Sequence, residues 1–135
     1  MALVYDFNDV KVVFGAIGLR KLISQENNGS IQMFIDSNLV PRLLELLQKS
    51  YFPKIQYEAA WCLTNIASGN NDQVQVLLNN GAIKAFIMLL NSPHISVVEH
   101  AIWGLGNIAG ESHLIRDLVL NEDAVLPISN ILDNA

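Results

Sequence analysis

Two Trp–Asn pairs are the residues of this sequence best suited to binding another molecule. Trp61 precedes Asn65 by four residues, and Trp103 precedes Asn107 by the same interval. Residues four apart lie on one face of a helix, so each pair is expected to present an indole beside an amide. An amide can donate to and accept from a peptide backbone, and an indole can pack the stem of Lys or Arg and attract its cation. The pairs therefore predict a surface that holds a basic peptide.

The interval between the two pairs fits an extended ligand. Packed helices lie about 8–10 Å apart, and an extended peptide rises about 3.3 Å per residue, so one helix-to-helix step spans about three ligand residues. A lone Trp is more often a core residue, and a lone Asn is more often a helix cap. The repeated pair favours a binding site instead, because a buried Asn must find partners for its amide.

Glu111 continues the stripe of Trp103 and Asn107 by another four residues. Its carboxylate is expected at the C-terminal end of that helix, where the backbone carbonyls carry partial negative charge. A ligand ammonium would be attracted by both groups, which predicts a lysine pocket. A solvated helix end is an equally open interpretation of Glu111.

The two pairs belong to an internal repeat. Residues 57–69 align with residues 99–110, and their Trp, Leu, Asn, Ile and Ala positions coincide at an offset of 42. A second series follows at nearly the same spacing, in the segments 38–41, 81–83 and 123–125. A unit of this length is too small to bury its own apolar face and must stack on its neighbours. The sequence therefore predicts an all-α solenoid with repeats of about 42 residues.

Each repeat is expected to contain two short helices and a longer third helix that carries the Trp and the Asn. The third helices are predicted over residues 54–68 and 94–110, after Pro53 and Pro93, because proline suits a helix start. Asn38, Gly81 and Asp123 follow the first helices, where a residue of positive φ is expected.

The repeat frame divides the chain into two whole and two partial units within a single domain, residues 1–135. We expect a solenoid truncated at both ends, which exposes apolar faces and makes self-association through those ends possible. The predicted units are a lone third helix over 1–24, full repeats over 25–69 and 70–110, and the first two helices of a further repeat over 111–135.

The composition excludes several classes of function. A net charge of −5 argues against nucleic-acid binding, which needs a Lys/Arg stripe, and favours basic partners. No apolar run is long enough to cross a bilayer, so no membrane association is expected. The single cysteine, Cys62, cannot form an internal disulfide, is expected in the core, and is consistent with a reducing compartment.

No catalytic or metal-binding pattern is found. His94, His100 and His113 do not share a helix face, and no metal-ligand spacing is present. The glycines of residues 104–110 form G-x-G-x-x-x-G inside a helical repeat with no preceding strand, so a nucleotide fingerprint fails and close helix packing is expected. No nucleophile has a plausible base. We predict a protein that is not an enzyme and has no cofactor.

Residues 60–69 (AWCLTNIASG) and 101–110 (AIWGLGNIAG) resemble the second and third armadillo repeats of the importin-α family. The resemblance continues through residues 116–120 (RDLVL) and more weakly through 20–24 (RKLIS), so it covers most of the chain from about residue 16. It implies a right-handed armadillo-repeat α-solenoid, present in cytoplasm and nucleus, that binds Lys/Arg-rich nuclear localisation signals of cargo proteins through its major site.

The resemblance also implies the residues of the site. Arg20 occupies the first repeat's equivalent of the Trp, Gly69 would lie in the lysine pocket, and Ser24 would sit at the other end of the peptide. The sequence departs from the family pattern at three positions. It has Glu111 where the family usually has Asp, Val74 where the family often has Thr, and His100 where Gln is common. The predicted peptide-binding residues are Trp61, Asn65, Trp103, Asn107, Gly69, Glu111, Ser24, Ser68 and His100.

The resemblance limits the expected partners. The basic N-terminal segment that binds importin-β, the third Trp/Asn pair and the later repeats of the family have no counterpart in this sequence. This chain is therefore not expected to bind importin-β directly, and weaker binding of short basic peptides than by a full array is expected. Two alternatives stay open: an armadillo scaffold for another partner, and a structural fragment that self-associates.

Overall fold

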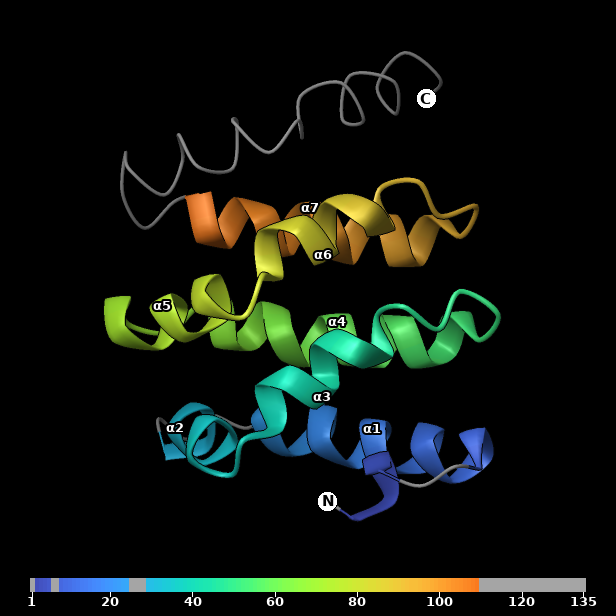
Figure 1. Cartoon of the computed structure of the whole chain (residues 1–135), viewed down its shortest axis with the longest axis horizontal. Helices are drawn as coiled ribbons and strands as arrows, with labels where there is room; N and C mark the ends of the chain where they lie inside the picture. The colour runs from blue at the N-terminus through green and yellow to red at the C-terminus, as the bar shows by residue number, and fades with distance from the viewer. Residues whose placement is uncertain (1, 6–7, 25–28, 110–135) are drawn as a thin grey trace.

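The helices of this protein are stacked in layers, as a computed structural model shows (Figure 1). The structure describes residues 2–5, 8–24 and 29–109. Within these ranges it has one 3-10 helix and seven α-helices. Their bounds are η1 Ala2–Tyr5, α1 Asp9–Ile23, α2 Gly29–Asp36, α3 Leu39–Leu46, α4 Pro53–Ala67, α5 Asn71–Asn79, α6 Ala82–Leu89 and α7 Ile95–Ala109.

Three long helices set the architecture. α1, α4 and α7 have 15 residues each and run in the same direction, with α4 packed between the other two (Figure 1). The shorter helices cover them, since α3 packs on α4 and α6 packs on α7. This is the predicted all-α solenoid. None of the helices described is long and apolar enough to cross a membrane.

The helix boundaries follow the local signals in the sequence. Pro53 opens α4 as predicted, and α7 begins at Ile95, two residues after Pro93. Asn38 and Gly81 have φ values of 58° and 80°, which confirms the expected positive φ before the second helices. Asp123 lies outside the described residues. The 3-10 helix η1, which packs on α1, was not predicted.

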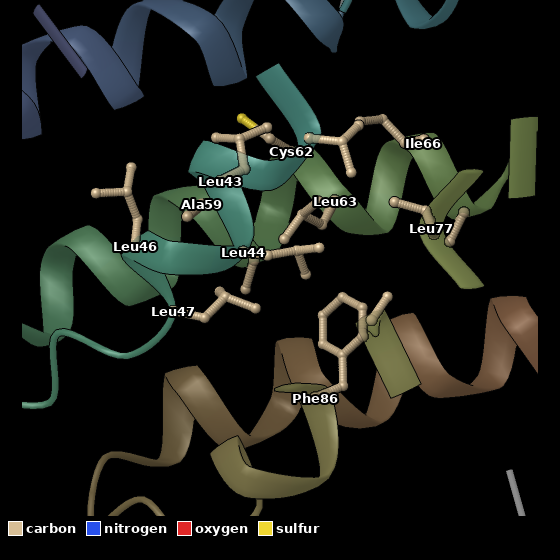
Figure 2. Packing of buried hydrophobic residues seen from close by; sticks show 14 of the residues in the cluster. Leu43, Leu44, Leu46, Leu47, Ala59, Cys62, Leu63, Ile66, Leu77 and Phe86 are labelled. Carbon is tan, nitrogen blue, oxygen red and sulfur yellow. The ribbon is translucent and has the colours of Figure 1, made fainter. Parts of the chain in front are cut away.

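The core forms where the second helices and α4 meet. Leu63 and Ile66 of α4 are fully buried, as is Phe86 of α6. Figure 2 shows side chains of two neighbouring layers packed together in this core. The labelled members are Leu43, Leu44, Leu46, Leu47, Ala59, Cys62, Leu63, Ile66, Leu77 and Phe86.

Cys62 lies in this cluster and is a buried free thiol, as the sequence predicted. Burial raises the pKa of this thiol well above its ordinary value, so the reactive thiolate is disfavoured. The cysteine therefore acts as a small core residue.

Gly104 allows α6 to approach α7 closely. A Cβ atom at this position would lie 2.9 Å from two carbons of the Phe86 ring, closer than real side chains pack. The predicted role in close packing is thus confirmed for Gly104. It stays a prediction for Gly106, where no described atom lies within 4 Å of the added carbon.

Replacing Gly104→Ala should destabilise the fold by roughly 1–3 kcal/mol, because the added methyl group overpacks the contact with Phe86. The matched control is Gly18→Ala in α1, where the added carbon meets nothing within 4 Å. The control should gain up to about 1 kcal/mol from helix propensity. Urea unfolding followed by circular dichroism measures both, and equal effects at the two sites would contradict the packing role.

Candidate functional site

A groove of about 240 Å³ lies between α4 and α7. Its walls come from successive turns of these two parallel helices, so equivalent residues of the two repeats face one another across it. The lining residues are Trp61, Thr64, Asn65, Ser68, His100, Trp103 and Asn107.

The groove brings together six of the nine residues predicted for the site. Trp61, Asn65 and Ser68 follow one another along the face of α4, and His100, Trp103 and Asn107 do so along α7. Whether they bind a peptide stays a prediction.

Thr64 lines the groove and was missed. Its counterpart at the repeat offset is Gly106, so the repeat gave no signal for it. The Thr64 hydroxyl donates to the carbonyl of His100 over 3.5 Å, and the Thr64 carbonyl accepts a hydrogen bond from Asn107 Nδ2 at 3.3 Å. Thr64 therefore connects the two repeats at the floor of the groove.

The two asparagines are oriented by backbone carbonyls. Asn65 Nδ2 donates to the carbonyl of Trp61 at 3.1 Å, one turn earlier on the same helix, whereas Asn107 Nδ2 donates across the groove to Thr64. Each amide keeps a carbonyl oxygen and a second N–H for another partner. Both side chains are half-buried, so these groups are fixed but reachable.

A stack of four side chains crosses the three long helices. The Arg20 guanidinium of α1 lies 4.4 Å from the centroid of the Trp61 ring. His100 follows on the other side, 5.3 Å from Trp61 and at 28° to its plane, and then Trp103, 5.9 Å from His100 and at 12°. Tyr57 meets both Trp61 and His100 edge to face. The predicted ladder of indoles is thus interleaved with a guanidinium and an imidazole.

His100 is the most enclosed aromatic member of this stack. Its side chain is buried, and Nδ1 has no hydrogen-bond partner within the described part of the protein. Burial lowers the pKa of His100 below its ordinary value, and the carboxylates of Glu58 and Glu99 only partly oppose this. The imidazole is therefore neutral at physiological pH.

A buried ion-pair network supports the stack from behind. The carboxylate of Glu58 is fully buried, accepts a hydrogen bond from Arg20 Nε at 2.8 Å, and lies 2.7 Å from Lys54 Nζ. Burial raises the pKa of this carboxyl, but the contacts with Arg20 and Lys54 outweigh that effect and hold the pKa below its ordinary value. The network fixes the guanidinium against the indole of Trp61.

Two predicted site residues, Ser24 and Gly69, do not line the groove, and a third cannot be placed. Ser24 is the exposed C-cap of α1, and its backbone N–H donates to the carbonyl of Arg20. Gly69 follows α4 and packs against Gln73, whose side chain would have to shift to admit a Cβ atom. Glu111 lies outside the described residues.

Two further sequence observations concern residues near the site. Val74, the departure from Thr, is fully buried in α5 and does not line the groove. Over the residues that the structure describes, no three His, Cys, Asp or Glu side chains are grouped so that they could hold a metal ion.

Comparison with known proteins defines the family. The family model of the armadillo/β-catenin-like repeat matches residues 27–68 and 70–110. The chain belongs to the armadillo-repeat family. Armadillo proteins among the solved structures share its fold: a designed armadillo repeat protein in complex with the peptide (KR)4 superposes with a TM-score of 0.90 at 29% identity, over 99% of this chain and 55% of that one.

Curated relatives of this armadillo chain are importin subunits. It is 45% identical over 114 residues to importin subunit alpha-2 of Arabidopsis thaliana, which is 84% of this chain and 21% of that protein. It is 46% identical over 109 residues to importin subunit alpha-1b of Oryza sativa subsp. japonica, which is 81% of this chain and 20% of that protein. The chain thus spans about a fifth of the length of these relatives.

Replacing Glu58→Gln should lower the free energy of unfolding by roughly 1–3 kcal/mol near neutral pH, because Arg20 and Lys54 lose their anionic partner. Since the pKa of Glu58 is lowered in the folded state, its contribution is complete above the unfolded value of about 4.3 and disappears as the pH falls through the folded value. The difference between wild type and variant should therefore be constant above about pH 5 and shrink below it.

Urea unfolding at a series of pH values measures this difference. The matched control is Glu45→Gln, which removes a carboxylate that is 65% exposed and pairs with Arg42. It should change stability by less than about 0.5 kcal/mol. A Glu58→Gln variant as stable as wild type would show that the network does not support the stack.

Proposed function

We propose that this chain is part of a nuclear-import adaptor and that its groove binds Lys/Arg-rich nuclear localisation signals in extended form. The observation that carries the proposal is the alignment of two Trp/Asn pairs along one groove between parallel helices. The relatives named importin subunit alpha support the assignment, as does the designed armadillo protein in complex with a peptide of alternating Lys and Arg.

The groove offers what an extended basic peptide requires. The free amide groups of Asn65 and Asn107 are complementary to peptide N–H and C=O groups, and they do not read sequence. Trp103 is 61% exposed, so its indole face is open to the stem and cation of a ligand Lys or Arg. Main-chain hydrogen bonds would thus set the path of the peptide, and the indole would select cationic side chains.

The charge distribution fits the same ligand. The chain carries a net charge of −5, and Arg20 and Lys54, two cations of the described residues that lie beside Trp61 and Tyr57, are paired with Glu58. A basic peptide therefore approaches an acidic protein in which these two cations share a buried carboxylate. In this function the chain acts in both cytoplasm and nucleus, with cargo proteins as its partners and no catalytic step.

Replacing Trp103→Ala should weaken binding of a basic peptide by roughly tenfold, because one cation–π contact and the packing of one ligand stem are lost. Fluorescence anisotropy of a fluorescein-labelled peptide of six lysines measures the Kd. Raising the salt concentration should also weaken binding, since the attraction between the acidic chain and the peptide is screened.

The control variant is Tyr51→Ala, which removes another exposed aromatic side chain that does not line the groove, and it should bind like wild type. A labelled peptide of six alanines should not bind. Equal affinity of wild type and the Trp103→Ala variant would place the basic peptide elsewhere and would leave the scaffold function as the better assignment.

A further inference from the structure

The slot between the two indoles is partly filled by a side chain of the protein itself. The imidazole of His100 stacks on Trp61 with a centroid distance of 5.3 Å and on Trp103 with a distance of 5.9 Å. The opposite face of Trp61 is covered by the guanidinium of Arg20 at 4.4 Å. A ligand cation that enters between the indoles must therefore share the aromatic faces with His100.

The charge of His100 determines how strongly this side chain disfavours the binding of a ligand cation between the indoles. A neutral imidazole stacks between two indoles and adds no positive charge to the groove. An imidazolium would itself be a cation against both indole faces, competing for the electron density that attracts a ligand Lys or Arg. It would also repel the ligand ammonium at short range in a partly enclosed site.

Among the residues that the structure describes, the groups around His100 do not cancel such a charge. Glu58 of α4 is the nearest buried carboxylate, but it is already paired with Arg20 and Lys54. The ring of Tyr57 meets the imidazole edge to face at 4.7 Å and contributes no carboxylate.

Two further charged residues on the described helices next to His100 lie at the surface. Glu99 precedes His100 on α7 and is exposed. Lys84, the one titratable residue of α6, is also exposed. From α1 the facing group is the Arg20 guanidinium, a second cation beyond Trp61. An imidazolium at position 100 therefore increases the positive potential of the groove.

We propose that His100 is a specificity-determining residue of the groove: the slot between Trp61 and Trp103 accepts a cationic side chain while the imidazole is neutral and rejects it once the imidazole is protonated. This inference rests on the proposed binding of basic peptides. Because Lys and Arg keep their charge throughout, acidification changes the groove and leaves the ligand unchanged. Release of the basic peptide on acidification follows.

The direction of the pH effect follows from the ordinary linkage of binding and titration. Burial lowers the pKa of His100 from its ordinary value, so the imidazole is neutral near pH 7.5. On acidification, protons and the basic ligand compete for the site. The Kd of a hexalysine peptide should rise by roughly threefold or more between about pH 7.5 and about pH 5.3, a range that stays above the pI of about 4.9.

The test compares wild type with His100→Gln, which replaces the imidazole by a neutral side chain that does not titrate. Anisotropy titrations of labelled hexalysine at both pH values should show that the variant's Kd changes by less than about twofold. The matched control is His94→Gln, which removes an exposed histidine just before α7 and should keep the wild-type pH dependence.

A second variant tests the role of His100 even if His100→Gln does not fold. The double variant His94→Gln, His113→Gln leaves His100 as the single histidine of the chain and should retain the whole pH dependence. Wild-type binding that is tight at neutral pH and unchanged on acidification would overturn the role of His100 while leaving the proposed function intact. Failure of wild type to bind hexalysine at pH 7.5 would overturn the proposed function itself.

Discussion

The packing of α4 between α1 and α7 is the constraint on which the rest of the structure depends. No single three-helix unit buries its own apolar face, so the core of the central repeat is completed by side chains from both neighbours. Polar contacts then fix the positions of the layers relative to one another. The Arg20–Glu58 ion pair joins α1 to α4, and the hydrogen bond from Asn107 to Thr64 joins α7 to α4.

These polar contacts lie beside the groove, so they connect stability to the shape of the site. A buried carboxylate is costly unless it is paired, and the pairing of Glu58 places a guanidinium against Trp61. The same regular stacking of parallel helices that buries the leucines places equivalent residues of the two repeats on opposite walls. The groove is thus a consequence of how the solenoid is held together and requires no separate structural element.

Much of this arrangement could be predicted from the sequence because it repeats. The interval between Trp61 and Trp103 predicted the layers, and the spacing to Asn65 and Asn107 placed both pairs on one groove. Residues that interrupt the repeat could not be predicted in the same way. His100 stacks on Trp61, which lies 39 positions earlier in the sequence, and on Trp103, which lies 3 positions later. The residue aligned with His100 in the previous repeat is not aromatic, so the repeat did not predict this stack. Thr64 was missed for the same reason.

The burial of Cys62 gives this chain an internal reporter of its own motions. The thiol is fully enclosed on α4, and it is the only cysteine in the sequence. An alkylating reagent can reach it only when the central layer opens, so the rate of thiol labelling under native conditions reflects the free energy of that opening. Local breathing of the middle repeat becomes measurable with a single covalent label, without denaturant and without altering any groove residue.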